Sequence, residues 1–202
     1  ELLERNVVSM KKSATAILVI LYACLSIPGA ARSEDKDKQS PSNKMTAYVT
    51  PGATEREAVV TLWMSNVNPV GAICLPFKFA AADSFWLDSL VTKPFRAGSF
   101  QMLQPKYEKD KQTLLVNMLR NADSVKAKVG LVPPGEGVLA TLHFSASSKF
   151  RLEEFKIASV QLPPENVLLY VTDTFNSVMP EFAMVRQAPP GSTSASKNDK
   201  TP

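Results

Sequence analysis

The sequence contains few of the residues from which active sites and metal centres are built. It has one histidine, His143, and two cysteines, Cys24 and Cys74. A zinc site needs three or four ligands, more than His143 and Cys74 can supply. No Ser or Cys lies in a recognisable nucleophile elbow, and no Asp-x-Asp-x-Asp-Gly calcium loop occurs. We therefore expect a protein that is not an enzyme and that needs no metal or cofactor.

The charge is close to balanced once the first segment is set aside. The full chain has 23 Lys and Arg against 19 Asp and Glu, a formal net charge of +4. From Glu34 onward 19 basic residues face 17 acidic ones, because Arg5, Lys11, Lys12 and Arg32 and two glutamates precede it. Binding to nucleic acid requires a clustered basic stripe, so we expect no nucleic-acid partner.

Residues 1–33 have the pattern of a targeting segment. Residues 1–9 precede Met10, and we place them outside the fold. The apolar run 14–25 (ATAILVILYACL) has the length of a signal-peptide core and is shorter than the roughly 20 residues of a spanning helix. Residues 10–33 therefore predict a signal peptide, cut after Ala31 or Ser33, and an exported mature chain without a transmembrane span. Periplasm, cell surface and extracellular medium all stay open as destinations.

Cys24 allows an alternative interpretation of the targeting segment, as that of a lipoprotein. The sequence Leu21-Tyr22-Ala23-Cys24 approximates the box at which bacterial lipoproteins are cut and lipidated, although Tyr22 is bulkier than that box usually permits. If Cys24 is instead discarded with the leader, Cys74 is the one cysteine of the mature chain, and no disulfide can form within it. The core alone must then stabilise the exported domain.

Two polar segments enclose one predicted domain. Residues 34–44 contain no apolar side chain, and residues 187–202 are rich in Pro, Ser, Thr and Lys. Neither segment can offset the entropy of ordering, so we expect both to be disordered tethers. Residues 45–186 show no comparable break and no internal repeat. A chain of that length buries roughly two-thirds of its unfolded surface, which is enough for a core.

The stretch 69–79 (PVGAICLPFKF) alternates with the two-residue period of a strand that has one buried face. The predicted inner residues are Ile73, Leu75, Phe77 and Phe79. The predicted outer residues are Ala72, Cys74, Pro76 and Lys78.

The stretch 133–145 (PPGEGVLATLHFS) alternates in the same way. Its predicted inner residues are Val138, Ala140, Leu142 and Phe144. Its predicted outer residues are Leu139, Thr141, His143 and Ser145. We expect these two stretches to be core strands of an antiparallel sandwich.

Short strands separated by turn residues account for the rest of the domain. The further predicted strands are 45–49, 58–65, 85–91, 100–103, 114–119, 125–132, 150–160, 167–171 and 182–185. The segment 150–157 fits helical and strand periods equally well. Many short strands at spacings of roughly 8 to 12 residues, without a clear amphipathic helix, favour an all-β sandwich or jelly roll.

Several of these stretches together resemble a known family. The succession VTLWMSNVNPVGAICLPFKF, FWLDSL, PPGEGVLATLHFSA and PPENVLLYVTDTFNSVMPEF is similar to the cohesin-like modules of bacterial exported proteins, within the wider group of jelly-roll cohesin and carbohydrate-binding domains. The resemblance implies an antiparallel jelly-roll sandwich of about nine strands. It also implies a noncatalytic module that binds a dockerin or another exported protein through one sheet face.

The resemblance places that binding face on residues 72–78, on the hairpin formed by 100–103 and 114–119, and on 139–145. The outward residues on the two alternating strands are Ala72, Cys74, Lys78, Leu139, Thr141 and His143. The alternative is that these residues only face water, which is usual for an antiparallel sheet with one solvated face.

Sugar binding is the alternative function, because related jelly rolls stack polysaccharide on aromatic rings. The candidate rings are Trp63, Trp86 and Tyr107, with Tyr48 and Tyr170 also available. The alternation around Trp63 leaves open whether it is buried or exposed. An exposed, coplanar set of rings would favour polysaccharide, whereas burial of both tryptophans would argue against it, since aromatic residues commonly fill cores.

Overall fold

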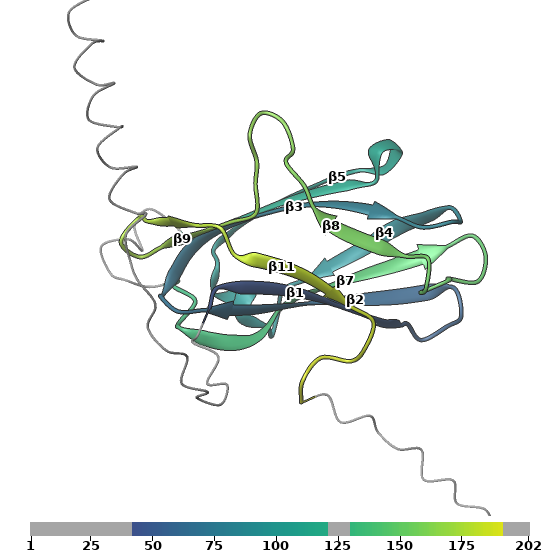
Figure 1. The fold of residues 1–202 in the computed structure, drawn as a ribbon, viewed down its shortest axis with the longest axis horizontal. Coiled ribbons are helices and arrows are strands. Elements are labelled where there is room, and N and C mark those ends of the chain that lie inside the picture. The colour runs from purple at the N-terminus through teal and green to yellow at the C-terminus, as the bar shows by residue number, and fades with distance from the viewer. Residues whose placement is uncertain (1–41, 121–129, 192–202) are drawn as a thin grey trace, which may run out of the picture. The chain divides into compact units, whose positions relative to one another are not determined.

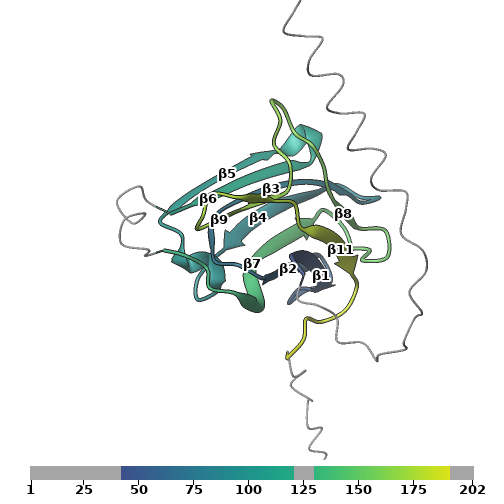
Figure 2. The ribbon, with the colours of Figure 1, turned by 60° about the vertical axis from the view of Figure 1, so that its left-hand side comes forward.

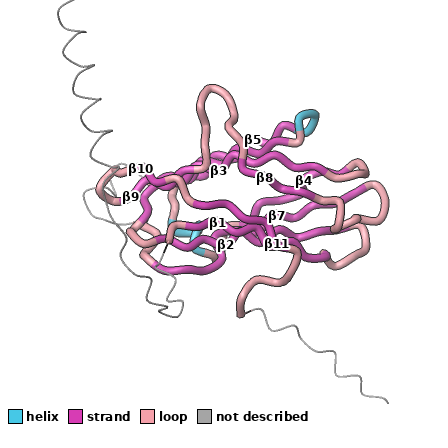
Figure 3. The backbone as a smooth tube through the Cα atoms, in the orientation of Figure 1, coloured by secondary structure: helices cyan, strands magenta, loops and turns pink. Residues whose placement is uncertain are grey.

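The computed structural model describes residues 42–120 and 130–191, which fold into two packed β-sheets (Figure 1). The predicted signal peptide (10–33), and most of the predicted strand 125–132, lie outside the described residues. The strands are β1 Lys44–Pro51, β2 Glu57–Asn66, β3 Val70–Ala80, β4 Phe85–Val91, β5 Met102–Glu108, β6 Thr113–Leu119, β7 Gly135–Ala146, β8 Lys156–Ser159, β9 Leu169–Thr172, β10 Ser177–Val178 and β11 Glu181–Val185. Two short 3₁₀ turns, η1 Arg96–Ser99 and η2 Lys109–Lys111, are the helical segments of the described chain (Figure 3).

The first sheet has the strand order β11-β1-β2-β7-β4, and the second sheet has the order β10-β9-β3-β6-β5, with β8 also paired to β3. Figure 2 shows the two sheets as stacked layers. The architecture is the predicted all-β jelly-roll sandwich, with eleven strands rather than about nine. The pairing is not wholly antiparallel, because β1 and β11 run parallel. None of the helical segments in the described ranges is long and apolar enough to cross a membrane.

The core fills the space between the sheets with side chains from the inner face of each strand. The predicted inner residues of β3 are all buried, with exposed fractions of 2% or less. Aromatic rings from both sheets meet there: Phe79 of the second sheet lies 4.9 Å from Phe144 of the first, measured between ring centroids. Phe155, which precedes β8, stacks on Phe79 at 6.2 Å. These contacts lock the two layers together, since paired aromatics add to the energy of burial.

The alternation of β7 is broken near its start. Ala140 pairs with Leu62, but Val138 pairs with Trp63, so Leu139 is an extra residue without a partner on β2. Such a β-bulge reverses the inside and outside of the residues on one side of it. Leu139 is completely buried, and Val138 shares the outer side with Trp63. The predictions that Leu139 faces outward and Val138 inward were therefore wrong.

The described residues extend slightly beyond the predicted domain limits. β1 begins at Lys44, and the backbone N–H of Glu181 donates to the carbonyl of Asn43 at 3.1 Å. At the other end the described chain continues to Gly191. Of the predicted strand 150–160, only β8, Lys156–Ser159, is a strand, and a turn from Arg151 to Glu154 precedes it.

Candidate interaction surfaces

The predicted binding residues do not form one face. Ala72, Cys74 and Lys78 lie on β3 in the second sheet, whereas Thr141 and His143 lie on β7 in the first. Because the sheets pack through their inner faces, the outer sides of β3 and β7 point away from each other. The prediction of a single face containing both sets was therefore wrong. Each outer face has to be considered by itself.

One end of the outer face of the second sheet has a row of apolar side chains. The strand registers place Met102 opposite Leu119, Leu119 opposite Ala72, and Ala72 opposite Val171. Directly opposed residues project from the same side of a sheet, so these four side chains cross β5, β6, β3 and β9 in a line, which we call the apolar row. Met102 is 43% exposed; the other three are partly exposed.

The next row is mixed and is partly covered. Gln104 lies opposite Asn117, Asn117 opposite Cys74, and Cys74 opposite Leu169. The Cys74 thiol is half-buried, with its Sγ 4.0 Å from the Oδ1 of Asn166. Asn166 belongs to the loop between β8 and β9, which rises above β3 (Figure 3). Burial raises the pKa of the Cys74 thiol above its usual value.

The far end of the same face is charged. The carboxylate of Glu108 lies 2.6 Å from the ammonium of Lys106 and 2.7 Å from that of Lys111. Hydrogen bonds from these two ammonium groups lower the pKa of Glu108 to about 2. A cavity of about 270 Å³ separates this cluster from the β8–β9 loop, which contributes Leu162 and Pro163 to its lining. The face therefore changes from apolar to charged along the strands.

Phe175 is a prominent apolar side chain that the sequence interpretation missed. It lies in the turn between β9 and β10 and is 68% exposed. Its backbone φ is 62°, a left-handed conformation that is uncommon for a bulky residue. The carbonyl and hydroxyl of Thr172 accept hydrogen bonds from the backbone N–H groups of Phe175 and Asn176. The ring of Phe175 also lies 5.8 Å from the guanidinium of Arg120.

The outer face of the first sheet is more polar near β4 and β7. The hydroxyl of Thr141 lies 3.2 Å from Nε2 of His143, and the hydroxyl of Ser145 donates to the carboxylate of Asp88 at 2.6 Å. In the described part of the chain, no three His, Cys, Asp or Glu side chains converge as a metal site would require. Thr141 and His143 are both partly exposed on this face.

The three candidate sugar-stacking rings are not brought together. Trp63 and Trp86 lie on β2 and β4 of the first sheet, whereas Tyr107 lies on β5 of the second. Trp86 has the ammonium of Lys109 5.8 Å from its ring centroid, and the Tyr107 hydroxyl donates to Gln112 Oε1 at 2.7 Å. All three rings are partly buried. They form no common platform for a polysaccharide.

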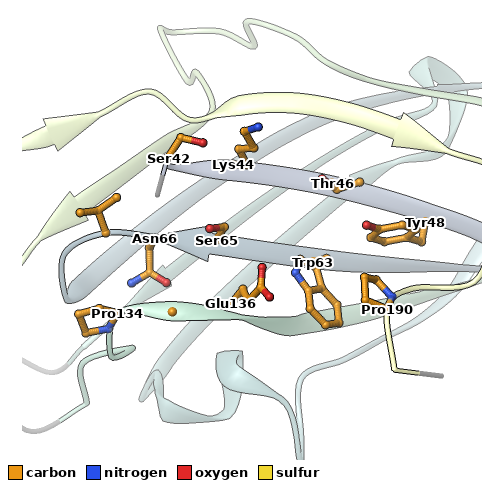
Figure 4. Close-up of a pocket in the computed structure, with 12 residues that line it drawn as sticks. Ser42, Lys44, Thr46, Tyr48, Trp63, Ser65, Asn66, Pro134, Glu136 and Pro190 are labelled. Carbon is orange, nitrogen blue, oxygen red and sulfur yellow. The ribbon is translucent and has the colours of Figure 1, made fainter. Parts of the chain in front are cut away.

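A groove of about 570 Å³ lies on the first sheet near the start of β7. Figure 4 shows Tyr48, Trp63 and Pro190 close together at one end of it, and Asn66 and Pro134 at the other. The rings of Tyr48 and Trp63 meet edge to face, with centroids 6.3 Å apart and planes inclined by 80°. Trp63 was one of the three candidate sugar-stacking rings, and Tyr48 was one of the two further rings considered. The contribution of Pro190 was not predicted, because the composition of residues 187–202 gave no packing signal.

No protein-family model matches the sequence, and no curated protein matches it either. Solved structures are similar in fold. The cohesin–dockerin complex Coh-OlpA-Doc918 of Clostridium thermocellum superposes with a TM-score of 0.53 at 10% identity, covering 72% of this chain and 99% of that one. The sixth cohesin of Acetivibrio cellulolyticus scaffoldin B, in complex with a Cel5 dockerin, gives 0.52 at 15% identity over 72% and 99%.

A third similar structure is the second type II cohesin module of the adaptor ScaA scaffoldin of Acetivibrio cellulolyticus, which includes a long C-terminal linker. It gives a TM-score of 0.52 at 10% identity, covering 78% of this chain and 96% of that one. These modules thus match over nearly their whole length, while the identities are low enough to speak for the fold alone. The two-sheet domain of this chain has a cohesin-like fold.

Proposed function

We propose that the domain is a noncatalytic protein-interaction module of an exported bacterial protein, which binds its partner through the outer face of the second sheet. The observation that carries this proposal is the apolar row, in which Met102, Leu119, Ala72 and Val171 align across β5, β6, β3 and β9. A partly exposed apolar line on a regular sheet is the kind of surface that a partner can cover.

The surroundings of the row fit an interface. Ala72, with its small side chain, lies between Leu119 and Val171, so a partner backbone or helix can approach the sheet closely there. Phe175 adds an exposed ring in the turn between β9 and β10. The charged cluster around Glu108 lies farther along the strands. An apolar centre with a polar rim is the usual anatomy of a protein interface.

The structural neighbours support a protein partner. Two of them were crystallised as cohesins bound to dockerins. A dockerin-type module of an exported protein is accordingly the first partner to test. The apolar row favours a protein ligand over a polysaccharide. Sugar binding would require aromatic rings on which the sugar stacks, whereas the row consists of aliphatic side chains.

The test compares charge substitutions on the two outer faces. Ala72→Glu and Met102→Glu introduce a carboxylate into the apolar row, whereas Thr141→Glu introduces one on the opposite sheet as a matched control. The domain and its variants are immobilised and exposed first to a panel of dockerin modules and then to the exported proteins of the source bacterium. Affinities for any captured protein are measured with the purified partner.

Loss of a central interface contact costs about 1 to 2 kcal/mol or more, so both row variants should weaken binding by roughly tenfold or more. Thr141→Glu should bind as the parent does. Circular dichroism melting must first show that all three variants are folded. If the folded row variants retain every partner at parental affinity, the second sheet is not the binding face.

A further inference from the structure

The groove on the first sheet is lined in part by the chain's own C-terminal region, through Pro190. Its aromatic end is formed by Tyr48 of β1 and Trp63 of β2, with Pro190 lining the same end (Figure 4). Its remaining walls are mainly polar and include Lys44, Ser65 and Glu136. We refer to it as the Tyr48–Trp63 groove. With a volume of about 570 Å³, it lies within the range of natural ligand pockets.

A specific anchor brings Pro190 to this place. Directly after β11, the guanidinium of Arg186 donates to three backbone carbonyls, those of Leu152 at 2.9 Å, Glu153 at 3.1 Å and Phe155 at 3.0 Å. These bonds fix the direction in which the chain leaves the sandwich. The segment that follows contains the sequence Ala188-Pro189-Pro190. Its position beside the groove is thus supported by hydrogen bonds as well as by the contact of one ring.

The chemistry of the groove suits proline. Consecutive prolines favour the extended polyproline II conformation, which has no internal hydrogen bonds and is already ordered before it binds. Grooves lined by aromatic residues recognise such segments by packing against the flat proline rings. Tyr48 and Trp63 meet at 80°, so they offer two differently oriented walls. The Ser65 hydroxyl, the Tyr48 phenol and the Trp63 indole N–H are donors for the carbonyls of an extended peptide.

We infer that the Tyr48–Trp63 groove is a binding site for a proline-rich peptide in the polyproline II conformation. In the same molecule Pro190 already lines the aromatic end of this groove, which makes the chain's own proline segment a tethered occupant of that end. A tethered segment acts at an effective concentration that reaches the millimolar range for short links. A proline-rich segment of another protein must therefore compete with this internal occupant.

The test uses the full chain with Trp86→Phe, which leaves Trp63 as the single tryptophan, because the sequence contains two. The probe is a ten-residue proline peptide, and a Gly-Ser peptide of equal length is the control. The decaproline peptide should produce a saturable change in Trp63 fluorescence, and the control peptide should not. Adding Pro189→Ala and Pro190→Ala removes the internal competitor and should tighten decaproline binding by several-fold.

Two further variants locate the binding. Tyr48→Ala, in the same Trp86→Phe chain, should weaken decaproline binding by roughly tenfold, as expected for loss of a central aromatic contact. Met102→Glu, on the opposite sheet, should leave decaproline binding unchanged even though it disrupts the proposed partner face. The two proposals can therefore fail independently.

Three results would overturn the inference. One is the absence of any decaproline binding at millimolar concentration, with or without Pro189 and Pro190. Another is a fluorescence response to cellohexaose but none to decaproline, which would make the groove a saccharide site. The third is a lower melting temperature for the Pro189→Ala, Pro190→Ala chain together with no binding of peptide. The contact of Pro190 with the groove would then only stabilise the fold.

Discussion

Arg96 and Asn66 are joined side chain to side chain, with Nη2 of Arg96 donating to Oδ1 of Asn66 at 2.9 Å. The same guanidinium donates to the backbone carbonyls of Met64 at 3.1 Å and Gly135 at 3.0 Å, and also to that of Pro133. Partial burial lowers the pKa of Arg96 from its usual value. This one side chain therefore ties η1 to the end of β2 and to the turn that leads into β7.

Replacement of Arg96 should destabilise the domain substantially. Arg96→Ala leaves the carbonyls of Met64 and Gly135 and the Asn66 amide oxygen without this donor, and hydrogen bonds to charged groups contribute roughly 1.5 to 3 kcal/mol. We expect a loss of about 2 to 4 kcal/mol in the free energy of unfolding, measured by urea denaturation. The control is Arg56→Ala, an exposed arginine, which should change stability by no more than about 0.5 kcal/mol. If both substitutions change the free energy of unfolding equally, the hydrogen bonds of Arg96 do not contribute to stability.

The burial of Leu139 gives a second prediction. Since this side chain is completely buried, Leu139→Ala should leave a cavity and cost about 2 to 5 kcal/mol of stability. Glu136→Ala, at an exposed position of the same strand, should be nearly neutral. Thermal or urea unfolding of both variants decides the matter. A neutral Leu139→Ala would mean that the bulge is absent and that Leu139 faces water, as simple alternation suggests.

The two alternating strands, β3 and β7, show how much of the fold can be predicted from the sequence. In β3 every predicted inner residue from Ile73 to Phe79 is buried, although Pro76, predicted as an outer residue, is buried as well. In β7 the same reasoning fails at Leu139, because one inserted residue reverses the phase. The apolar run Val138-Leu139-Ala140 is equally compatible with both phases. Only the pairing with β2 shows that Val138 lies opposite Trp63 and that Leu139 is the inserted residue.

The binding face required information that alternation does not contain. A two-residue period tells which side of its own strand a residue occupies, but not which sheet the strand joins. Cys74 and Thr141 were both predicted to face outward, yet they lie in different sheets. The apolar row likewise depends on the registers among four strands, of which only β5 and β6 are neighbours in sequence. Such long-range pairing is fixed by the packing of the whole domain rather than by any local pattern.

The charged cluster at the far end of the second sheet predicts an unusual titration. Lys106 and Lys111 lower the pKa of Glu108 to about 2, so its carboxyl should titrate in NMR with a midpoint far below the ordinary value of about 4.3. A depressed carboxyl pKa stabilises the fold above the unfolded-state pKa, and this contribution disappears as the pH falls through about 2. Lys106→Ala combined with Lys111→Ala should return the midpoint to the ordinary range. An unshifted midpoint in the parent domain would mean that the ion pairs do not persist in solution.

The environment of Cys74 leads to the last prediction, which concerns thiol reactivity. Cys74 is half-buried below Asn166, and burial raises its pKa. Because the thiolate is the reactive form, a disulfide reagent at pH 8 should label Cys74 in the folded domain several-fold more slowly than in urea.

Removing the cover should reverse part of this protection. The Asn166 amide also donates to the carbonyl of Pro163 at 2.9 Å, which holds the β8–β9 loop in place. Asn166→Ala should therefore speed up labelling of the folded domain, whereas Asn68→Ala, at an exposed position before β3, should not. Labelling at the unfolded rate would mean that the loop leaves the thiol open to solvent. A complete lack of labelling before denaturation would mean that Cys74 is buried rather than on the outer face, and the phase of β3 would then have to be reversed.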